Sequence, residues 1–373
     1  MENNYNFWDE YILKIKNKIL ELCDEKEYLY IDMHIHSNYS SDGKQSITDI
    51  INTTKEKGFD IISVTDHDSI DVYDELYEIV KNGLTTPIIV PGIEFTVDNR
   101  SYGNQCHILQ LFINPKDKEL LSKVKINYKS SFNRSKIQIK RLKCNKAIKE
   151  LMKENNINFS YTEYITFLNK NNLIPEYDTL SEYIMQKFKS KNITTFMILE
   201  RLEKYNKLDC YDDRKEYKKN RYEKLKSKYT KIEENYYNSH LLLSMLAVKE
   251  VDDDWWEEPI WGSLSVNSYG QLKINELNKK FLTFFAHPTE KKLNIVKNII
   301  SENKNIKGIE KNIRNEYLNI DSFNNLLKEE KLYEIIGSDS HDSTMNFYKD
   351  MTYFKIKSDK IKEIILGDAY GKN

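Results

Sequence analysis

Histidines and carboxylates of this chain occur in short motifs beside apolar runs. Six of the seven histidines fall in five such motifs, and only His240 stands apart. In the first motif, Asp32-Met33-His34-Ile35-His36, the two histidines are two residues apart, so in a strand both side chains point to the same side and both can reach one metal ion. Taken alone, such a pair is weak evidence for metal binding.

The remaining motifs repeat this placement beside other apolar runs. They are Asp42 in the loop after the first motif, Thr65-Asp66-His67-Asp68, Gly92-Ile93-Glu94, His107 in CHILQLFI, Ala286-His287-Pro288 and Gly337-Ser338-Asp339-Ser340-His341. Singly, Glu94 is typical of a loop acid and His107 of a buried structural histidine. Together the motifs offer nine nitrogen and oxygen ligands: His34, His36, Asp42, His67, Glu94, His107, His287, Asp339 and His341. Nine ligands without a thiolate suit zinc, manganese or iron and exceed what one tetrahedral ion needs, so we expect two to three divalent metal ions.

The segments around the motifs predict an α/β fold. Residues 28–113 alternate short apolar strands with helical stretches, and this rhythm returns after Phe281. We expect these strands to be parallel, so that their carboxyl ends meet at one mouth of a barrel, where the ligands should converge. We therefore predict an N-terminal amphipathic helix, a barrel and a long helical insertion; the expected ranges are 1–27 for the helix, 28–114 with 281–373 for the barrel and 115–280 for the insertion.

In this order, DMHIHS with SDG, TDHD, GIE, the isolated His107, AHP and GSDSH resemble the metal motifs of the PHP (polymerase and histidinol phosphatase) family of metal-dependent phosphoesterases. The resemblance covers about residues 29–113 and 281–366. It implies a distorted (β/α)7 TIM-like barrel that holds three metal ions and hydrolyses a phosphate ester.

The same resemblance implies how the ligands are shared among the ions. His34, His36 and Asp339 would hold one ion. Glu94 would bridge to a second ion, which His107 and His287 complete. The third ion would be held by Asp42, His67 and His341. Such a cluster activates a bridging water near neutral pH and neutralises the phosphate oxygens.

The candidate catalytic residues are His34, His36, Glu94, Asp339 and Asp66. Asp66 and Asp68 are expected to orient ligand histidines from behind. For Asp68 a second interpretation stays open, in which it is the N-cap of the next helix.

The insertion carries a concentrated positive charge. Lys123 to Lys149 contains eight lysines, two arginines and no acid, a local charge of +10 in a chain of net charge −1. Two interpretations stay open: a helix that binds phosphate or nucleic acid, and a helix paired with the protein's own acidic surface. On the first interpretation the candidate substrate contacts are Arg134, Lys140, Arg141 and Lys143.

Two further features of the insertion bear on its role. The stretch INFSYTEYI resembles part of the helical subdomain that supplies phosphate-gripping arginines in PHP phosphoesterases acting on nucleotides, but no equivalent of its arginine and histidine follows Pro175. The tryptophans Trp255, Trp256 and Trp261 either pack the insertion against the barrel, which we favour, or stack a base or anchor a protein partner.

Composition limits the class of protein. The four cysteines form no CxxC pair, which indicates a reducing compartment, and we expect a cytoplasmic protein. Lysines at 14, 16 and 18 interrupt the apolar N-terminal stretch, which argues against a signal peptide and a membrane span.

We predict hydrolysis of a small phosphomonoester, a nucleotide or a short oligonucleotide. One alternative is a nuclease on longer, including single-stranded, DNA or RNA, within a multi-protein defence or repair system. Another alternative is a non-catalytic module that binds a protein partner through its insertion. The nine-ligand set argues against this last alternative.

Overall fold

The protein is described by a computed structural model, which covers residues 2–40, 42–99, 104–144, 146–171, 173–175, 177–194, 197–198, 201, 271–289, 292–313, 320–341 and 346–370. The chain divides into two compact units, residues 1–128 with 270–373 and residues 129–269. Both boundaries fall inside the range 115–280 that we named as the insertion. His240 and the three tryptophans of the insertion lie outside the described residues.

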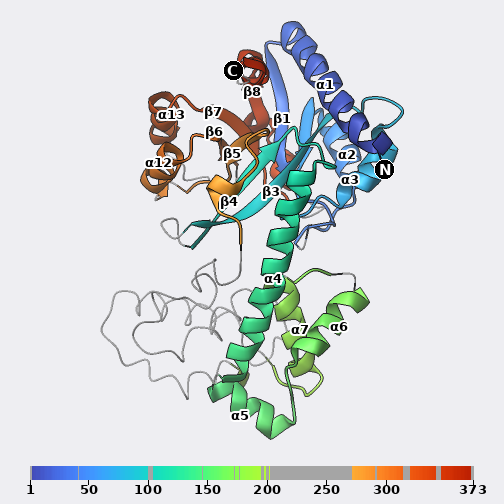
Figure 1. The fold of residues 1–373 in the computed structure, drawn as a ribbon, viewed down its shortest axis with the longest axis vertical. Helices are drawn as coiled ribbons and strands as arrows, with labels where there is room; N and C mark the ends of the chain where they lie inside the picture. Colours follow the sequence, from blue (N-terminus) through green and yellow to red (C-terminus); the bar gives the residue numbers. More distant parts are fainter. Residues whose placement is uncertain are drawn as a thin grey trace. The chain divides into compact units, whose positions relative to one another are not determined.

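The first unit alternates strands and helices along most of its length (Figure 1). Its strands are β1 (Tyr28–Ile35), β2 (Ile61–Val64), β3 (Ile88–Asn99), β4 (Asn104–Leu111), β5 (Leu282–Phe285), β6 (Ile306–Asn312), β7 (Tyr333–Gly337) and β8 (Lys355–Lys357). Its helices are α1 (Glu2–Glu25), α2 (Ile47–Lys57), α3 (Val72–Val80), α12 (Leu293–Glu302), α13 (Ile320–Glu329) and α14 (Ser358–Tyr370), with short 3-10 turns η3 (Ile274–Glu276), η5 (Asn346–Lys349) and η6 (Met351–Phe354).

The strands form one mixed sheet in the order β7-β6-β5-β4-β3-β2-β1-β8. Strands β1 and β7 then approach each other at their carboxyl ends: the His36 amide donates to the Ser340 carbonyl at 2.9 Å, and the Asp339 amide donates to the His34 carbonyl at 2.8 Å. Strands β1 to β7 therefore form a nearly closed barrel, with β8 added to β1. This arrangement confirms the predicted α/β barrel.

The barrel departs from a fully parallel one at β4. Strand β4 is antiparallel to both β3 and β5, whereas the pairs β1–β2, β2–β3, β5–β6 and β6–β7 are parallel. Because β4 runs the other way, its amino end lies at the same mouth as the carboxyl ends of its parallel neighbours. A residue near the start of β4 can therefore join ligands at the ends of other strands.

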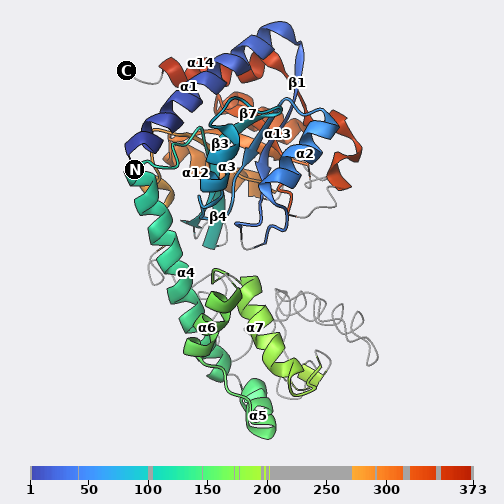
Figure 2. The ribbon, with the colours of Figure 1, turned by 90° about the vertical axis from the view of Figure 1, so that its right-hand side faces the viewer.

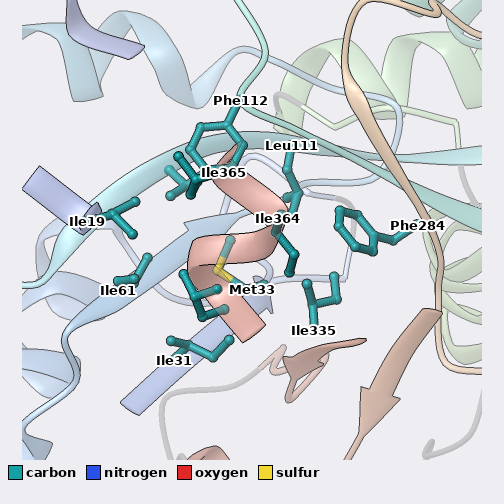
Figure 3. Close-up of a pocket in the computed structure, with 12 residues that line it drawn as sticks. Ile19, Ile31, Met33, Ile61, Leu111, Phe112, Phe284, Ile335, Ile364 and Ile365 are labelled. Atoms are coloured by element: carbon teal, nitrogen blue, oxygen red, sulfur yellow. The ribbon is translucent and has the colours of Figure 1, made fainter. Parts of the chain in front are cut away.

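The opposite end of the barrel is filled by apolar side chains and covered by α1 and α14, which lie side by side (Figures 1 and 2). Ile19 of α1 and Ile364 of α14 face Met33 of β1 around a small cavity of about 20 Å³ whose lining residues are all apolar (Figure 3). Trp8 of α1 is fully buried, with its ring centroid 5.5 Å from that of Tyr73. The N-terminal helix is thus part of the barrel core.

Capping residues mark both ends of α2 and the start of α4. Ser46 is the N-cap of α2 and accepts a hydrogen bond from the Asp49 amide, and Gly58 ends this helix with a left-handed backbone (φ 80°). At the start of α4 (Lys118–Cys144), Asp117 accepts hydrogen bonds from the amides at 119 and 120.

The second unit has its own apolar core. From α4 the chain continues into α5 (Lys146–Asn155), α6 (Tyr161–Asn171) and α7 (Tyr177–Lys189). Ile148, Phe159, Tyr164 and Phe188 are among the fully buried members of this core. Within the described part of the chain, no helix combines the length and the apolar character that crossing a membrane requires.

Candidate metal centre

All nine predicted ligands lie together at the mouth of the barrel. Three groups of them have ligand atoms close enough to hold a metal ion: His36, Asp42, His67 and His341; His34, His36, Glu94 and Asp339; and His67, Glu94 and His107. His287 joins through its contacts with Glu94 and His107. His107 lies near the start of the antiparallel strand β4, opposite Thr96 of β3, which explains how it reaches this mouth.

The innermost group brings four ligand atoms around one point. The Nε2 atoms of His34 and His36 are 3.0 Å apart. Glu94 Oε2 lies 3.1 and 3.3 Å from these two nitrogens, and Asp339 Oδ1 lies 3.5 and 3.2 Å from them. Four atoms bound to one ion at about 2.0–2.1 Å in a tetrahedron are roughly 3.3 Å apart. The observed spacings therefore fit one shared cation.

Hydrogen bonds around this group fix which imidazole nitrogens carry protons. His34 Nδ1 is 3.1 Å from both oxygens of Glu310, and an ionised carboxylate can only accept, so Nδ1 carries the proton. The single hydroxyl proton of Ser40 goes to Asp42 at 2.9 Å, so Ser40 Oγ must accept from His36 Nδ1 at 3.2 Å. In neutral His34 and His36 both Nε2 atoms therefore present lone pairs to each other, an arrangement that a cation between them would stabilise.

A second group surrounds the other oxygen of Glu94. Its Oε1 lies 3.1 Å from His107 Nδ1 and 3.1 Å from His287 Nε2, and these two nitrogens are 3.1 Å apart. Glu94 thus presents one oxygen to each of two neighbouring groups. A carboxylate placed in this way would be shared by both groups if each of them held an ion.

The third group lies closer to solvent. Asp42 Oδ2 is 3.0 Å from His341 Nε2 and 3.4 Å from His67 Nε2. On its other side His67 Nδ1 lies 2.9 Å from Glu94 Oε2, yet neither atom has a hydrogen bond of acceptable geometry, although both are buried. Buried polar atoms normally have a partner, so these two atoms also fit a site for cations.

The charges of the group support the same conclusion. Burial opposes the charge on Glu94, but three neighbouring imidazoles, led by that of His34, hold its pKa well below the usual range. Burial likewise opposes protonation of His34 and His67, yet nearby carboxylates, led by Glu94, raise the pKa of both histidines well above the usual value. Glu94 is therefore ionised at neutral pH, which is the form that binds cations.

Two of the nine residues have strained backbones. His287 has φ 27° and Asp339 has φ 53°, in the left-handed region that non-glycine residues rarely adopt. Such strain persists where the surroundings hold it and is frequent at functional sites. Here the His287 amide donates to Glu310 Oε2 at 2.7 Å, and the Asp339 amide donates to the His34 carbonyl at 2.8 Å.

Sequence reasoning missed two buried carboxylates behind the ligands. Glu310 on β6 contacts His34 and His287, as described above. Asp32 on β1 accepts hydrogen bonds from the Ser338 amide at 2.9 Å and from the Tyr348 hydroxyl at 2.7 Å, and burial raises its pKa to about 6. Both acids lie in buried strands, and their local sequence pattern does not show which face of the strand they occupy.

Asp66 and Asp68 accept hydrogen bonds from backbone segments that adjoin the nine residues. Asp66 is buried and accepts from the Ser37 amide and hydroxyl, both at 2.6 Å, so it holds the residue that follows His36. The N-cap interpretation of Asp68 is wrong, because α3 begins at Val72 after Asp71. Asp68 instead has a left-handed backbone (φ 49°) and accepts from the Thr96 amide at 3.0 Å and from Asn127 Nδ2 at 2.6 Å.

The candidate substrate contacts lie on α4, in the second unit. Arg134 is only 6% exposed, and its guanidinium is 3.4 Å from the Pro175 carbonyl oxygen, to which it donates. Lys140 and Lys143 are exposed, whereas the side chain of Arg141 lies outside the described residues. The structure therefore presents the two lysines to solvent and places Arg134 in the packing of its own unit.

Comparison with known proteins identifies the domain. The sequence profile of the family described as PHP domain matches residues 32–194. This match confirms the family resemblance drawn from the motifs. It ends before His287, Asp339 and His341, so the structure alone brings these three residues to the others. No curated protein matches the chain.

Three solved structures are similar in fold. The first, a candidate metal-dependent phosphoesterase from Bifidobacterium adolescentis, is 13% identical with a TM-score of 0.48, over 90% of this chain and 95% of that one. The second, an amidohydrolase from Chromobacterium violaceum with bound sulfate and no metal, is 14% identical with a TM-score of 0.49, over 88% and 98%. The third, a two-domain protein from Bacteroides vulgatus with a predicted PHP-like metal-dependent phosphoesterase, is 12% identical with a TM-score of 0.34, over 85% and 53%. At these values the likenesses give no indication of activity or substrate.

Proposed function

Because the chain contains a PHP domain, we propose that it is a metal-dependent hydrolase that cleaves a phosphate ester, with two to three divalent ions held by the nine residues at the barrel mouth. One observation carries this proposal. Glu94 is fully buried, and its carboxylate lies within 3.3 Å of imidazole nitrogens from five histidines. A purely structural acid would need one or two such partners, whereas a carboxylate shared by neighbouring ions needs this arrangement.

The nine residues form a buried side and a partly exposed side of the centre. His34, His36 and Glu94 are completely buried and would hold ions from below. The side chains of Asp42 and His287 are 27% and 29% exposed, so substrate would arrive on their side. Divalent ions bound here would supply Lewis acidity to phosphate oxygens and an activated water as nucleophile. Ser40 and Asp66 would keep His36 in place during turnover, Ser40 through the ring and Asp66 through Ser37.

A substrate panel tests the proposal directly. We expect the protein loaded with Mn²⁺ or Zn²⁺ to hydrolyse at least one class among phosphomonoesters, cyclic nucleotides, and single-stranded DNA and RNA, and we expect a chelator to abolish that hydrolysis. The measurement is phosphate or nucleotide release over time. A metal-loaded protein that cleaves carboxamides and none of these phosphate esters would contradict the phosphoesterase assignment.

A second candidate, nuclease activity on longer strands, is favoured by the surface of α4. Lys129, Lys136, Lys140 and Lys143 are exposed, and their spacing of seven, four and three residues places them on one side of the helix. At 1.5 Å per residue the row extends about 21 Å, which is long enough to follow several phosphates of an extended strand. A mononucleotide would contact only part of such a row.

Charge reversal on α4 separates a nucleotide substrate from a longer strand. Replacing Lys136, Lys140, Arg141 and Lys143 by Glu is expected to weaken the binding of an oligonucleotide and to leave the metal content unchanged. Each phosphate contact contributes roughly 0.7–0.9 to the slope of log Kd against log salt, so the wild-type slope should be several-fold larger for an oligonucleotide than for a mononucleotide. The large slope should collapse in the variant. The measurement is Kd or KM across a salt series.

The matched control reverses four exposed lysines of the barrel unit, Lys14, Lys57, Lys307 and Lys328. It introduces the same change in net charge and should keep the wild-type slope. Identical slopes and affinities in all three proteins would leave α4 as a structural helix.

A further inference from the structure

Glu310 is a buried carboxylate that contacts two of the nine ligands without being one of them. It lies on β6 and is 0% exposed. On one side both of its oxygens are 3.1 Å from His34 Nδ1. On the other side Oε2 accepts from the His287 amide at 2.7 Å, and Oε1 accepts from Asn312 Nδ2 at 3.0 Å. One side chain therefore connects β1, β6 and the segment that follows β5.

Its contact with His34 determines which nitrogen of that ring faces the centre. A carboxylate accepts and cannot donate when ionised, so the proton of neutral His34 stays on Nδ1. The lone pair is then on Nε2, the atom that lies 3.1 Å from Glu94 Oε2. A carboxylate behind a ligating histidine also increases the basicity of the ring.

Glu310 contacts His287 through the backbone amide of that residue. The φ of His287 is 27°, a strained value for a residue with a side chain. The 2.7 Å hydrogen bond from its amide to Glu310 holds this conformation, and with it the direction in which the imidazole leaves the chain.

The neighbouring strand leaves room for the carboxylate. Gly337 on β7 has no side chain, and a Cβ there would lie 2.2 Å from Glu310 Oε1 and 2.6 Å from His34 Cβ. Any larger residue at 337 would displace the pair. The absence of a side chain at 337 therefore leaves the space in which Glu310 and His34 contact each other.

From these contacts we infer that Glu310 is a positioning residue of the metal centre, which fixes the tautomer of His34 and the backbone of His287 so that both rings face the bound ions. This inference rests on the proposed function, because it requires ions at the centre.

Replacing Glu310 by Gln tests it without changing the size of the side chain. The substitution removes the charge and turns one acceptor into a donor. We expect the affinity for Zn²⁺, measured by competition with a chromophoric chelator, to weaken about 10–100-fold. In the metal-free protein, at a pH at which His34 is neutral, nitrogen NMR of labelled histidines should show a single Nδ1–H tautomer of His34 in the wild type and its loss in Glu310→Gln.

The matched control is Glu334→Gln on the adjacent strand β7, where Glu334 pairs with Lys360. It should change neither the affinity nor the tautomer. A second variant, Asn312→Ala, removes one hydrogen bond to Glu310 but keeps the carboxylate, and it should weaken Zn²⁺ binding in the same direction by less. If Glu310→Gln does not fold, the Zn²⁺ affinity of Asn312→Ala tests the role of Glu310.

The outcomes separate this inference from the proposed function. If the wild-type protein binds Zn²⁺ and both variants bind it equally well with an unchanged His34 tautomer, the role of Glu310 is overturned and the proposed function stands. If the wild-type protein binds no divalent ion, both are overturned together.

Discussion

Glu94→Gln is expected to lower metal-dependent hydrolysis by at least about 1,000-fold while the barrel stays folded. Gln keeps the size of the side chain but removes its charge, and it places an amide hydrogen among nitrogens that lie within 3.3 Å of Glu94 in the wild-type protein. Lewis-acid stabilisation by a metal amounts to several kcal/mol, and about 4 kcal/mol corresponds to roughly 1,000-fold in rate. The measurement is kcat/KM on the best substrate of the panel, with thermal denaturation to verify the fold.

The matched control is Glu329→Gln on α13. Glu329 is exposed and pairs with Lys297 at 2.6 Å, and surface pairs of this kind contribute about 0–1 kcal/mol. It should retain full activity. Wild-type turnover in a folded Glu94→Gln protein would show that the chemistry takes place away from this centre.

The barrel and the meeting of the nine residues were accessible from the sequence because both depend on local patterns. Alternating apolar strands and helices predict a barrel, and side chains two apart in a strand share a face, which brings His34 and His36 together. The position of each motif beside an apolar run then predicts one common mouth. These arguments need no knowledge of which strands are neighbours.

The direction of β4 needed more exact strand boundaries. Only four residues separate the end of β3 at Asn99 from the start of β4 at Asn104, and so short a connection joins antiparallel strands, whereas a parallel crossover needs a dozen residues or more. The apolar runs alone suggested that β3 ended and β4 began several residues further apart. Because the connection looked longer in the sequence than it is, the antiparallel pairing of β3 with β4 was not predicted.

Glu310 and Asp32, the buried acids beside the ligands, make contacts with residues that are distant in sequence. Glu310 and His34 are 276 residues apart, and Asp32 and Tyr348 are 316 apart. A carboxylate in an apolar strand has the same local pattern whether it faces the barrel interior or a helix outside. Only the closure of the sheet, which brings β1 beside β7, shows that these acids lie under the ligands.

Removing the metal ions is expected to abolish hydrolysis and also to destabilise the barrel. Without cations the carboxylates of Glu94, Asp42 and Asp339 stay close together, and the Nε2 atoms of His34 and His36 remain 3.0 Å apart. An ion present at 1,000 times its Kd stabilises the folded state by about 4 kcal/mol. For a unit of this size, 1 kcal/mol shifts Tm by roughly 2–4 °C. Chelation should therefore lower Tm by about 8–16 °C for each such ion lost.

Returning metal to the chelated protein should restore Tm and activity at two to three equivalents, which elemental analysis and thermal denaturation measure together. Asp42→Asn provides the matched variant, because the carboxylate of Asp42 lies 3.4 Å from His67 and 3.0 Å from His341 in the third group. It should lower the stoichiometry by one ion and leave the ion between His34 and His36 in place. A wild-type protein that takes up no more than one ion after metal loading would contradict a multinuclear centre, because nine converging ligands would then serve a single cation.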